Sequence, residues 1–195
     1  MFIKPNYLIK EHAGILKVTD TYDIIDPETN TKIAEAKENV SGWIKFGRLL
    51  INKKLMPTLI EIKSATDGSI QYSMKRGVSF FTSKVEVLDK NQTSMGYFKS
   101  RMFSFGGHFD VYGSNDTKIA DVKGKWTGWE FKFTDTAGNE LGLVSKKWAG
   151  FGKELFTSAD NYMISLSPAA QDKKEIMPLL IMAGIAIDVV FKEKK

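Results

Sequence analysis

The chain contains no cysteine and only two histidines among its 195 residues. The absence of cysteine excludes disulfide bonds, thiolate metal sites, a catalytic cysteine and S-palmitoylation. A GxSxG nucleophile elbow is also missing, and no glycine-rich segment continues into the Lys-Ser or Lys-Thr pair of a phosphate-binding loop. His108 follows two glycines at an expected strand start, where we interpret it as a solvated turn residue. The sequence therefore predicts no catalytic site, and we expect a protein that is not an enzyme.

Long hydrophobic runs are equally scarce. The longest apolar run extends from Ile176 to Ile187 and is interrupted by Asp188, well short of the roughly 20 residues that a bilayer requires. A helix that is apolar on every side yet too short to cross a membrane is expected inside a protein core. We therefore predict a core helix at about 173–191, with Pro178 in its first turns, where a missing amide costs least.

Asp188 is the polar residue of this predicted helix that most needs an explanation. A buried carboxylate must find hydrogen-bonding partners or lose its charge. One interpretation is structural, with the carboxylate bonded to barrel backbone amides or to a tyrosine, lysine or arginine side chain. The other is a functional proton or ion site.

The net charge is mildly basic, at +5 with a pI of about 9.2. Lysines and arginines are scattered along the chain, which is typical of an ordinary solvated surface, although a diffuse attraction to anionic lipid is the alternative. No RRM, KH or zinc motif accompanies them, so we expect no nucleic-acid partner. Because residues 1–6 do not form the apolar region of a signal peptide, we expect a cytoplasmic protein that is at most peripheral at a membrane.

Short apolar segments separated by polar turns dominate the rest of the chain. Phe109 and Val111 alternate with Asp110 and Tyr112, which is the period of a strand with one buried face. Strands are predicted near 7–12, 15–26, 32–38, 58–64, 69–76, 80–88, 94–103, 108–113, 117–125, 129–135, 139–147 and 161–166. About twelve antiparallel strands avoid exposed edges by closing, but so wide a barrel cannot fill its interior with strand side chains alone. We predict one mainly β domain over residues 1–195, a closed antiparallel barrel around the C-terminal apolar helix.

Two aromatic segments interrupt this pattern. Residues 43–55 lack strand alternation and predict a short helix ended by Pro57, which either caps one mouth of the barrel or lies on a membrane surface. The residues that would contact lipid in the second case are Trp43, Lys45, Arg48, Lys53 and Lys54. Residues 124–129 predict a tight hairpin, and its Trp126 and Trp129 either pack at the barrel rim or touch lipid.

Several motifs in the same order resemble the phospholipid scramblase and LURP-one-related family, over roughly residues 20–193. They are Thr58–Ile62 with Asp67-Gly68 and Lys75-Arg76-Gly77, Val85–Asp89 with Met95-Gly96, Phe131–Phe133 with Ala137–Glu140, Val144–Trp148, and Glu154–Tyr162 followed by the apolar helix. The resemblance implies the tubby-like fold, a twelve-stranded barrel around a central hydrophobic helix, which agrees with the strand pattern.

The resemblance also raises the question of calcium, because eukaryotic scramblases carry a proposed calcium loop before the final helix. The matching segment here runs from Ser158 to Ala169 and keeps only one carboxylate, Asp160, so we expect no calcium site and no other cofactor. We expect a non-enzymatic domain that binds anionic phospholipid, a membrane surface or a protein partner. The alternatives are a scramblase that translocates lipid and a purely structural or protein-interaction module; the oligomeric state is left open.

Overall fold

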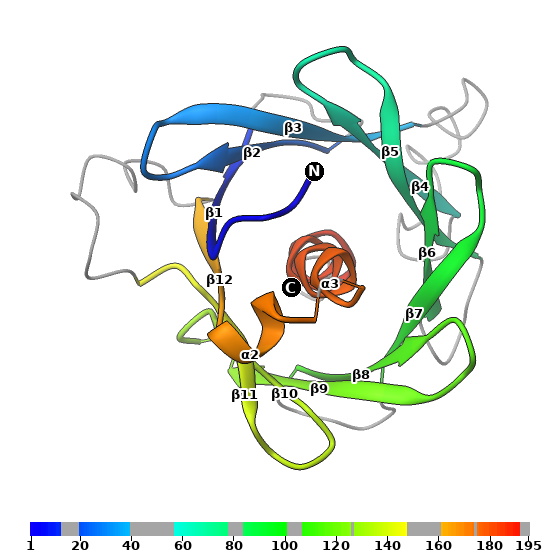
Figure 1. The fold of residues 1–195 in the computed structure, drawn as a ribbon, viewed down its shortest axis with the longest axis vertical. Helices are drawn as coiled ribbons and strands as arrows, with labels where there is room; N and C mark the ends of the chain where they lie inside the picture. Colours follow the sequence, from blue (N-terminus) through cyan, green and yellow to red (C-terminus); the bar gives the residue numbers. More distant parts are fainter. Residues whose placement is uncertain are drawn as a thin grey trace.

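The computed structural model describes residues 1–12, 20–39, 57–77, 84–100, 107–125, 127–147, 161–173 and 175–191. Within them, twelve strands form a closed barrel around a helix, which confirms the predicted fold class (Figure 1). The strands are β1 (Asn6–Glu11), β2 (Thr21–Asp26), β3 (Thr31–Glu38), β4 (Thr58–Ser64), β5 (Ile70–Arg76), β6 (Lys84–Asp89), β7 (Ser94–Ser100), β8 (His108–Gly113), β9 (Lys118–Lys125), β10 (Glu130–Thr134), β11 (Glu140–Ser145) and β12 (Tyr162–Leu166).

Every strand pairs antiparallel with its neighbour in sequence, and β1 closes the ring by pairing with β12. Closure removes the unpaired edges that a sheet would otherwise expose. The tight turns between strands are held by aspartate side chains: Asp67 accepts the Ser69 amide at 3.0 Å, and Asp135 accepts the Ala137 amide at 3.0 Å. Such local bonds explain why the chain reverses at these polar segments.

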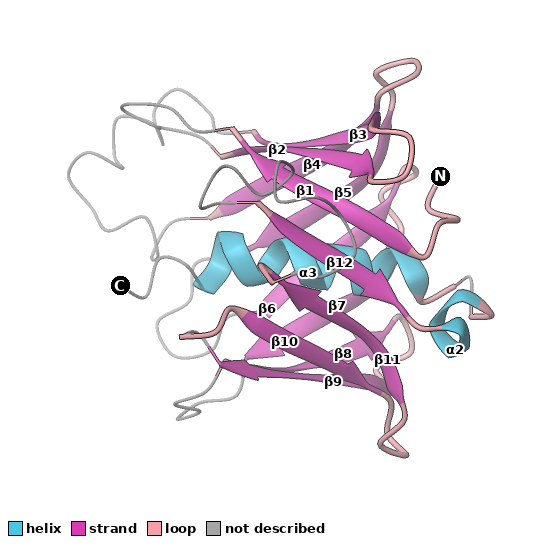
Figure 2. Cartoon of the chain, turned by 90° about the vertical axis from the view of Figure 1, so that its left-hand side faces the viewer, coloured by secondary structure: helices cyan, strands magenta, loops and turns pink. Residues whose placement is uncertain are grey.

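The up-and-down topology gives the barrel two different rims (Figure 2). At one, which we call the short-turn rim, the connections are 27–30, 65–69, 90–93, 114–117 and 135–139. At the other, which we call the long-loop rim, they are 12–20, 39–57, 77–83, 101–107, 126–129 and 146–161. The ends of β1, β3, β5, β7, β9 and β11 therefore meet at the long-loop rim, together with the starts of the even-numbered strands.

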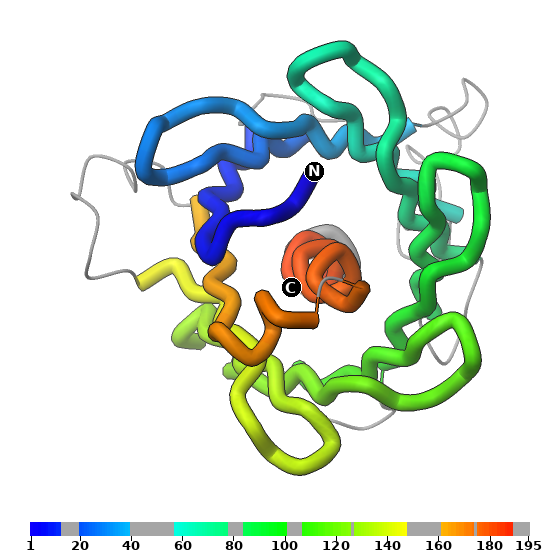
Figure 3. Tube along the Cα trace, in the orientation of Figure 1, coloured from blue at the N-terminus to red at the C-terminus, as the bar shows by residue number. Residues whose placement is uncertain are grey.

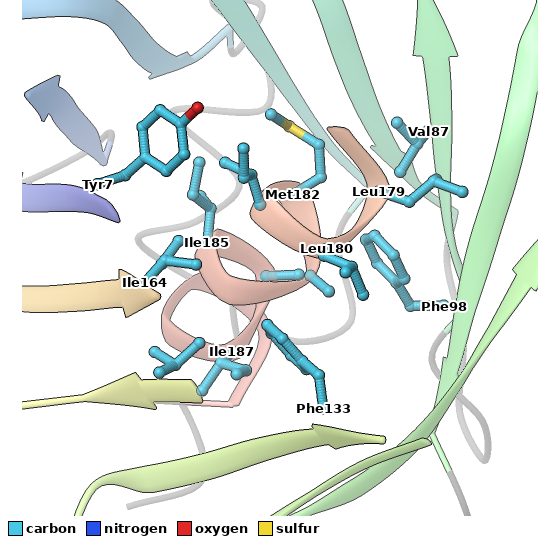
Figure 4. Packing of buried hydrophobic residues seen from close by; sticks show 14 of the residues in the cluster. Tyr7, Val87, Phe98, Phe133, Ile164, Leu179, Leu180, Met182, Ile185 and Ile187 are labelled. Carbon is cyan, nitrogen blue, oxygen red and sulfur yellow. The ribbon is translucent and has the colours of Figure 1, made fainter. Parts of the chain in front are cut away.

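The C-terminal helix α3 (Met177–Phe191) lies along the barrel axis, as the traces in Figures 2 and 3 show. It starts on the side of the short-turn rim and runs toward the long-loop rim. Its described apolar side chains from Met177 to Ile187, among them Leu180, Met182 and Ile185, are buried among side chains from the strands (Figure 4). Complete burial of each such side chain contributes about 1.5–3 kcal/mol.

Gly184 is a position at which α3 approaches the sheet closely. A Cβ at this residue would lie 2.5 Å from Ile164 Cδ1 and 3.3 Å from Val144 Cγ2, so any larger side chain must displace its neighbours. The glycine therefore allows α3 to sit against β11 and β12.

Of the alternation predicted for β8, the burial of Phe109 and Val111 and the partial exposure of Tyr112 agree with the structure, whereas Asp110 is also buried, where it pairs with Lys118 at 2.8 Å. The start of the helix differs from the prediction. A separate short helix, α2 (Pro168–Gln171), precedes it, capped by the Ser167 hydroxyl, which accepts the Ala170 amide. The observed helix α3 therefore begins at Met177, four residues after the predicted start at about 173, because turn residues precede it.

Candidate functional site

A cavity of about 420 Å³, open to solvent, lies at the long-loop rim where β3, β4 and β5 end or begin. Its lining residues are Asn39, Pro57, Thr58, Leu59, Lys75, Arg76 and Gly77. The two charged members are both cations and come from the last two residues of β5. A volume in this range is typical of small-molecule sites, so the cavity can hold an anionic group of modest size.

Strand alternation places the two cations differently. Arg76 follows the inward-facing Met74, is 5% exposed, and donates from Nη2 to Thr58 Oγ1 at 3.0 Å across the β4–β5 pair. Lys75 is exposed, and its Nζ donates to Gln92 Oε1 at 3.0 Å. A buried guanidinium held by Thr58 beside an exposed lysine is a combination suited to phosphate, which accepts several charge-assisted hydrogen bonds.

Most of the site residues predicted from the sequence lie outside the described residues. These are Trp43, Lys45, Arg48, Lys53, Lys54, Trp126 and Asp160. Their roles therefore stay predictions. The two that the structure describes, Trp129 and Asp188, both lie toward the long-loop rim, on the connection before β10 and near the end of α3.

Trp129 packs at the barrel rim. Its ring lies 4.9 Å from that of Tyr162 and 5.8 Å from that of Phe131, while the Lys146 ammonium sits 4.5 Å over its face. The indole adopts this position although its backbone φ is 48°, a conformation uncommon for a side chain of this size. Of the two interpretations of this hairpin, rim packing is the one that these contacts support for Trp129.

Asp188 is 1% exposed on α3 and close enough to two tyrosines to influence their ionisation. Burial raises the pKa of Tyr22 and Tyr162 well above the usual value for a phenol, and the Asp188 carboxylate raises both further. The two phenols therefore stay neutral and surround the helix end with polar but uncharged groups. The two tyrosines are close to the carboxylate, but the choice between the structural and the functional interpretation of Asp188 stays a prediction.

The two histidines lie on separate strand pairs, and each is bonded to an aspartate. His12 Nε2 lies 2.8 Å from Asp23 Oδ2 at the β1–β2 pair, and His108 Nε2 lies 3.1 Å from Asp121 Oδ1 at the β8–β9 pair. The expectation of a solvated turn histidine is wrong for His108. The residue begins β8, and its side chain is only 16% exposed because it packs against the neighbouring strand.

His108, Asp110 and Asp121 bring three possible metal ligands within 4.8 Å of one another. Lys118 already donates to both carboxylates, at 2.8 Å from Asp110 Oδ1 and 2.8 Å from Asp121 Oδ1. Burial alone would raise the pKa of Asp121, but hydrogen bonds from Lys118 and His108 hold it below its usual value. The protein thus supplies its own cation here, and a metal ion would have to compete with Lys118.

The segment that corresponds to the family's calcium loop does not form a loop in its described part. Residues 162–166 are strand β12, and Ala169, at the expected last ligand position, lies in α2. An alanine offers no side-chain oxygen, and a paired strand cannot wrap its carbonyls around a hard cation. This arrangement does not fit a calcium ion.

The fold and these sites together define a closed β-barrel with a buried apolar helix and a basic cavity at one rim. A sequence profile described as Scramblase matches residues 67–194, which is more than half of the chain. The chain therefore belongs to the scramblase family, which confirms the resemblance. No curated protein and no solved structure matches it.

Family membership supports a lipid-related role, and a scramblase-family barrel is not a typical enzyme fold. Among the described residues, no helix has both the length and the apolar character needed to cross a membrane. The cavity was not predicted from the sequence, although Lys75-Arg76-Gly77 belongs to one of the motifs that resemble the family. Two adjacent cations at the end of a predicted strand were the available signal.

Proposed function

We propose that this chain is a non-enzymatic scramblase-family domain that binds anionic phospholipid at a membrane surface, from the cytoplasmic side. The observation that carries the proposal is the cavity at the ends of β4 and β5, which Lys75 and Arg76 line and where the Arg76 guanidinium lies beside Thr58. A phospholipid phosphate would accept hydrogen bonds from these groups. The family assignment and the net charge of +5 support the same ligand class.

Two other functions remain consistent with the family. Lipid translocation by a mechanism in which α3 leaves the barrel is disfavoured by the burial of that helix from Met177 to Asp188. A protein-interaction module would use the same rims for a protein in place of lipid. The lipid proposal is preferred because the cavity pairs cationic groups with an apolar wall that includes Pro57 and Leu59.

The test is sedimentation of the full chain with vesicles of phosphatidylcholine, with and without phosphatidylserine, comparing Lys75→Gln with Lys63→Gln. Both lysines are exposed residues of the β4–β5 hairpin, but Lys63 lies at its opposite end and pairs with Glu61 at 3.2 Å. A basic residue near an anionic surface contributes about 1 kcal/mol, so Lys75→Gln should weaken binding roughly fivefold. If the two substitutions weaken binding equally, the cavity is not the binding site. If vesicles with and without phosphatidylserine bind equally, anionic lipid is not the ligand.

A further inference from the structure

Among the described residues, the two rims of the barrel carry opposite net charge. We consider charged residues in the two terminal positions of each strand and in the described parts of the connections. At the long-loop rim the cations are Lys10, Lys37, Lys75, Arg76, Lys84, Lys99, Lys125, Lys146 and Lys147, and the carboxylates are Glu11, Asp20, Glu38 and Glu130. Nine cations thus face four carboxylates, or five with the buried Asp188.

The balance is reversed at the short-turn rim. Its cations are Lys4, Lys32, Lys63, Lys90, Lys118 and Lys173, and its carboxylates are Asp26, Glu28, Asp67, Asp89, Asp116, Asp135, Glu140, Asp172 and Glu175. Six cations therefore face nine carboxylates. The basic excess of the described chain is concentrated at the rim that also contains the cavity.

Ion pairing increases this difference. Four of the six lysines of the short-turn rim, Lys4, Lys32, Lys63 and Lys118, are paired with carboxylates, as in Lys4 with Asp26 at 3.3 Å and Lys118 with Asp121 at 2.8 Å. The long-loop rim has six exposed lysines that form no salt bridge with any carboxylate in the described part of the chain. They are Lys37, Lys75, Lys84, Lys99, Lys125 and Lys147. Because the Lys75 ammonium donates to Gln92 in the short-turn connection 90–93, we call the other five the lysine ring.

Two members of the lysine ring are held close together by the sheet. Lys84 and Lys99 are direct partners in the β6–β7 register, and the Lys84 ammonium lies 3.9 Å over the Tyr97 ring. Like charges placed directly opposite each other on a sheet are destabilising. An external anion at this rim would remove that repulsion.

The geometry points to an oriented docking surface: we propose that the lysine ring places the long-loop rim against an anionic membrane, with the short-turn rim directed away. This inference rests on the proposed function and specifies which face binds. Charge complementarity selects the partner, since five exposed lysines at one rim match an extended anionic surface. The negative short-turn rim would be repelled by the same surface, which fixes the orientation.

Because the chain has no cysteine, a single introduced cysteine can report orientation without background labelling. Thr127→Cys at the long-loop rim and Thr66→Cys at the short-turn rim are matched exposed threonines in turns. Each full-length variant, labelled with an environment-sensitive dye, is mixed with vesicles of phosphatidylcholine with or without phosphatidylserine. With phosphatidylserine, the Thr127→Cys label should shift to the blue and be shielded from a water-soluble quencher, whereas the Thr66→Cys label should be unchanged.

A charge series provides the second measurement. Lys84→Gln combined with Lys99→Gln should weaken binding to phosphatidylserine vesicles roughly 30-fold, at about fivefold for each lysine. The matched pair Lys63→Gln and Lys90→Gln at the other rim should leave it within twofold. Binding that shields both labels equally, or the Thr66→Cys label alone, would overturn the orientation and leave the proposed function standing. Absence of binding to phosphatidylserine vesicles would overturn both.

Discussion

Truncation of Leu180 to alanine tests whether α3 is the core of the barrel. Leu180 is 0% exposed and lies among strand side chains at the centre of the molecule (Figure 4). The substitution removes three carbon atoms, worth about 2.4 kcal/mol of transfer free energy at roughly 0.8 kcal/mol each. The cavity left behind adds to this, and leucine-to-alanine changes in packed cores cost about 2–5 kcal/mol. We expect a loss of about 3 kcal/mol in the free energy of unfolding.

The assay is urea unfolding followed by tryptophan fluorescence. With a dependence of about 2 kcal/mol per molar urea, the loss should lower the unfolding midpoint by roughly 1.5 M. Ile3→Ala is the control, because Ile3 is 79% exposed and its truncation should change stability by no more than about 0.5 kcal/mol. If Leu180→Ala and Ile3→Ala shift the midpoint equally, α3 does not pack inside the barrel and the reasoning fails.

Two further predictions concern packing and pH. Gly184→Val should destabilise the fold by about 1–3 kcal/mol, since even a Cβ would lie 2.5 Å from Ile164 Cδ1; a midpoint equal to wild type in urea would contradict this. Asp121 has a pKa below its usual value in the folded chain, so its charge stabilises the fold above the unfolded pKa of about 3.9, and this contribution is lost as the pH falls through the lowered pKa. The stability difference between wild type and Asp121→Asn should therefore shrink from pH 7 to pH 2.5; a constant difference across urea titrations at these pH values would refute it.

The strands could be predicted from the sequence because their signals are local. Polar turns and period-two alternation located β8 at 108–113 and β4 at 58–64 with the bounds that the structure has. The start of α3 was harder to predict from the sequence, because an uninterrupted apolar run indicates burial but not the residue at which the first helical hydrogen bond forms. The short helix α2 had a readable start signal, Ser167 followed by Pro168, that the longer run obscured.

The charge distribution could not be predicted from the order of residues. Lys37, Lys84 and Lys125 are far apart along the chain, so their spacing is typical of a scattered, solvated surface. In an up-and-down barrel, however, every odd-numbered strand ends and every even-numbered strand begins at the same rim. Lysines at such positions gather in space whatever their separation in sequence. The cavity has the same origin, since its lining comes from the ends of three strands whose register only the closed sheet fixes.

The burial of α3 also distinguishes between two membrane roles for this domain, lipid translocation with α3 released and surface binding by the intact barrel. Release of the helix would expose its own apolar side chains, at about 1.5–3 kcal/mol each. A bilayer could accept that surface, but it could not cover the inner face of the sheet, where Phe98, Phe133 and Ile164 would be left facing water. Release of α3 would therefore cost free energy through apolar surface exposed on the barrel as well as on the helix. Contact with lipid through the lysine ring requires no such opening, and so surface binding by the intact barrel is the energetically consistent role.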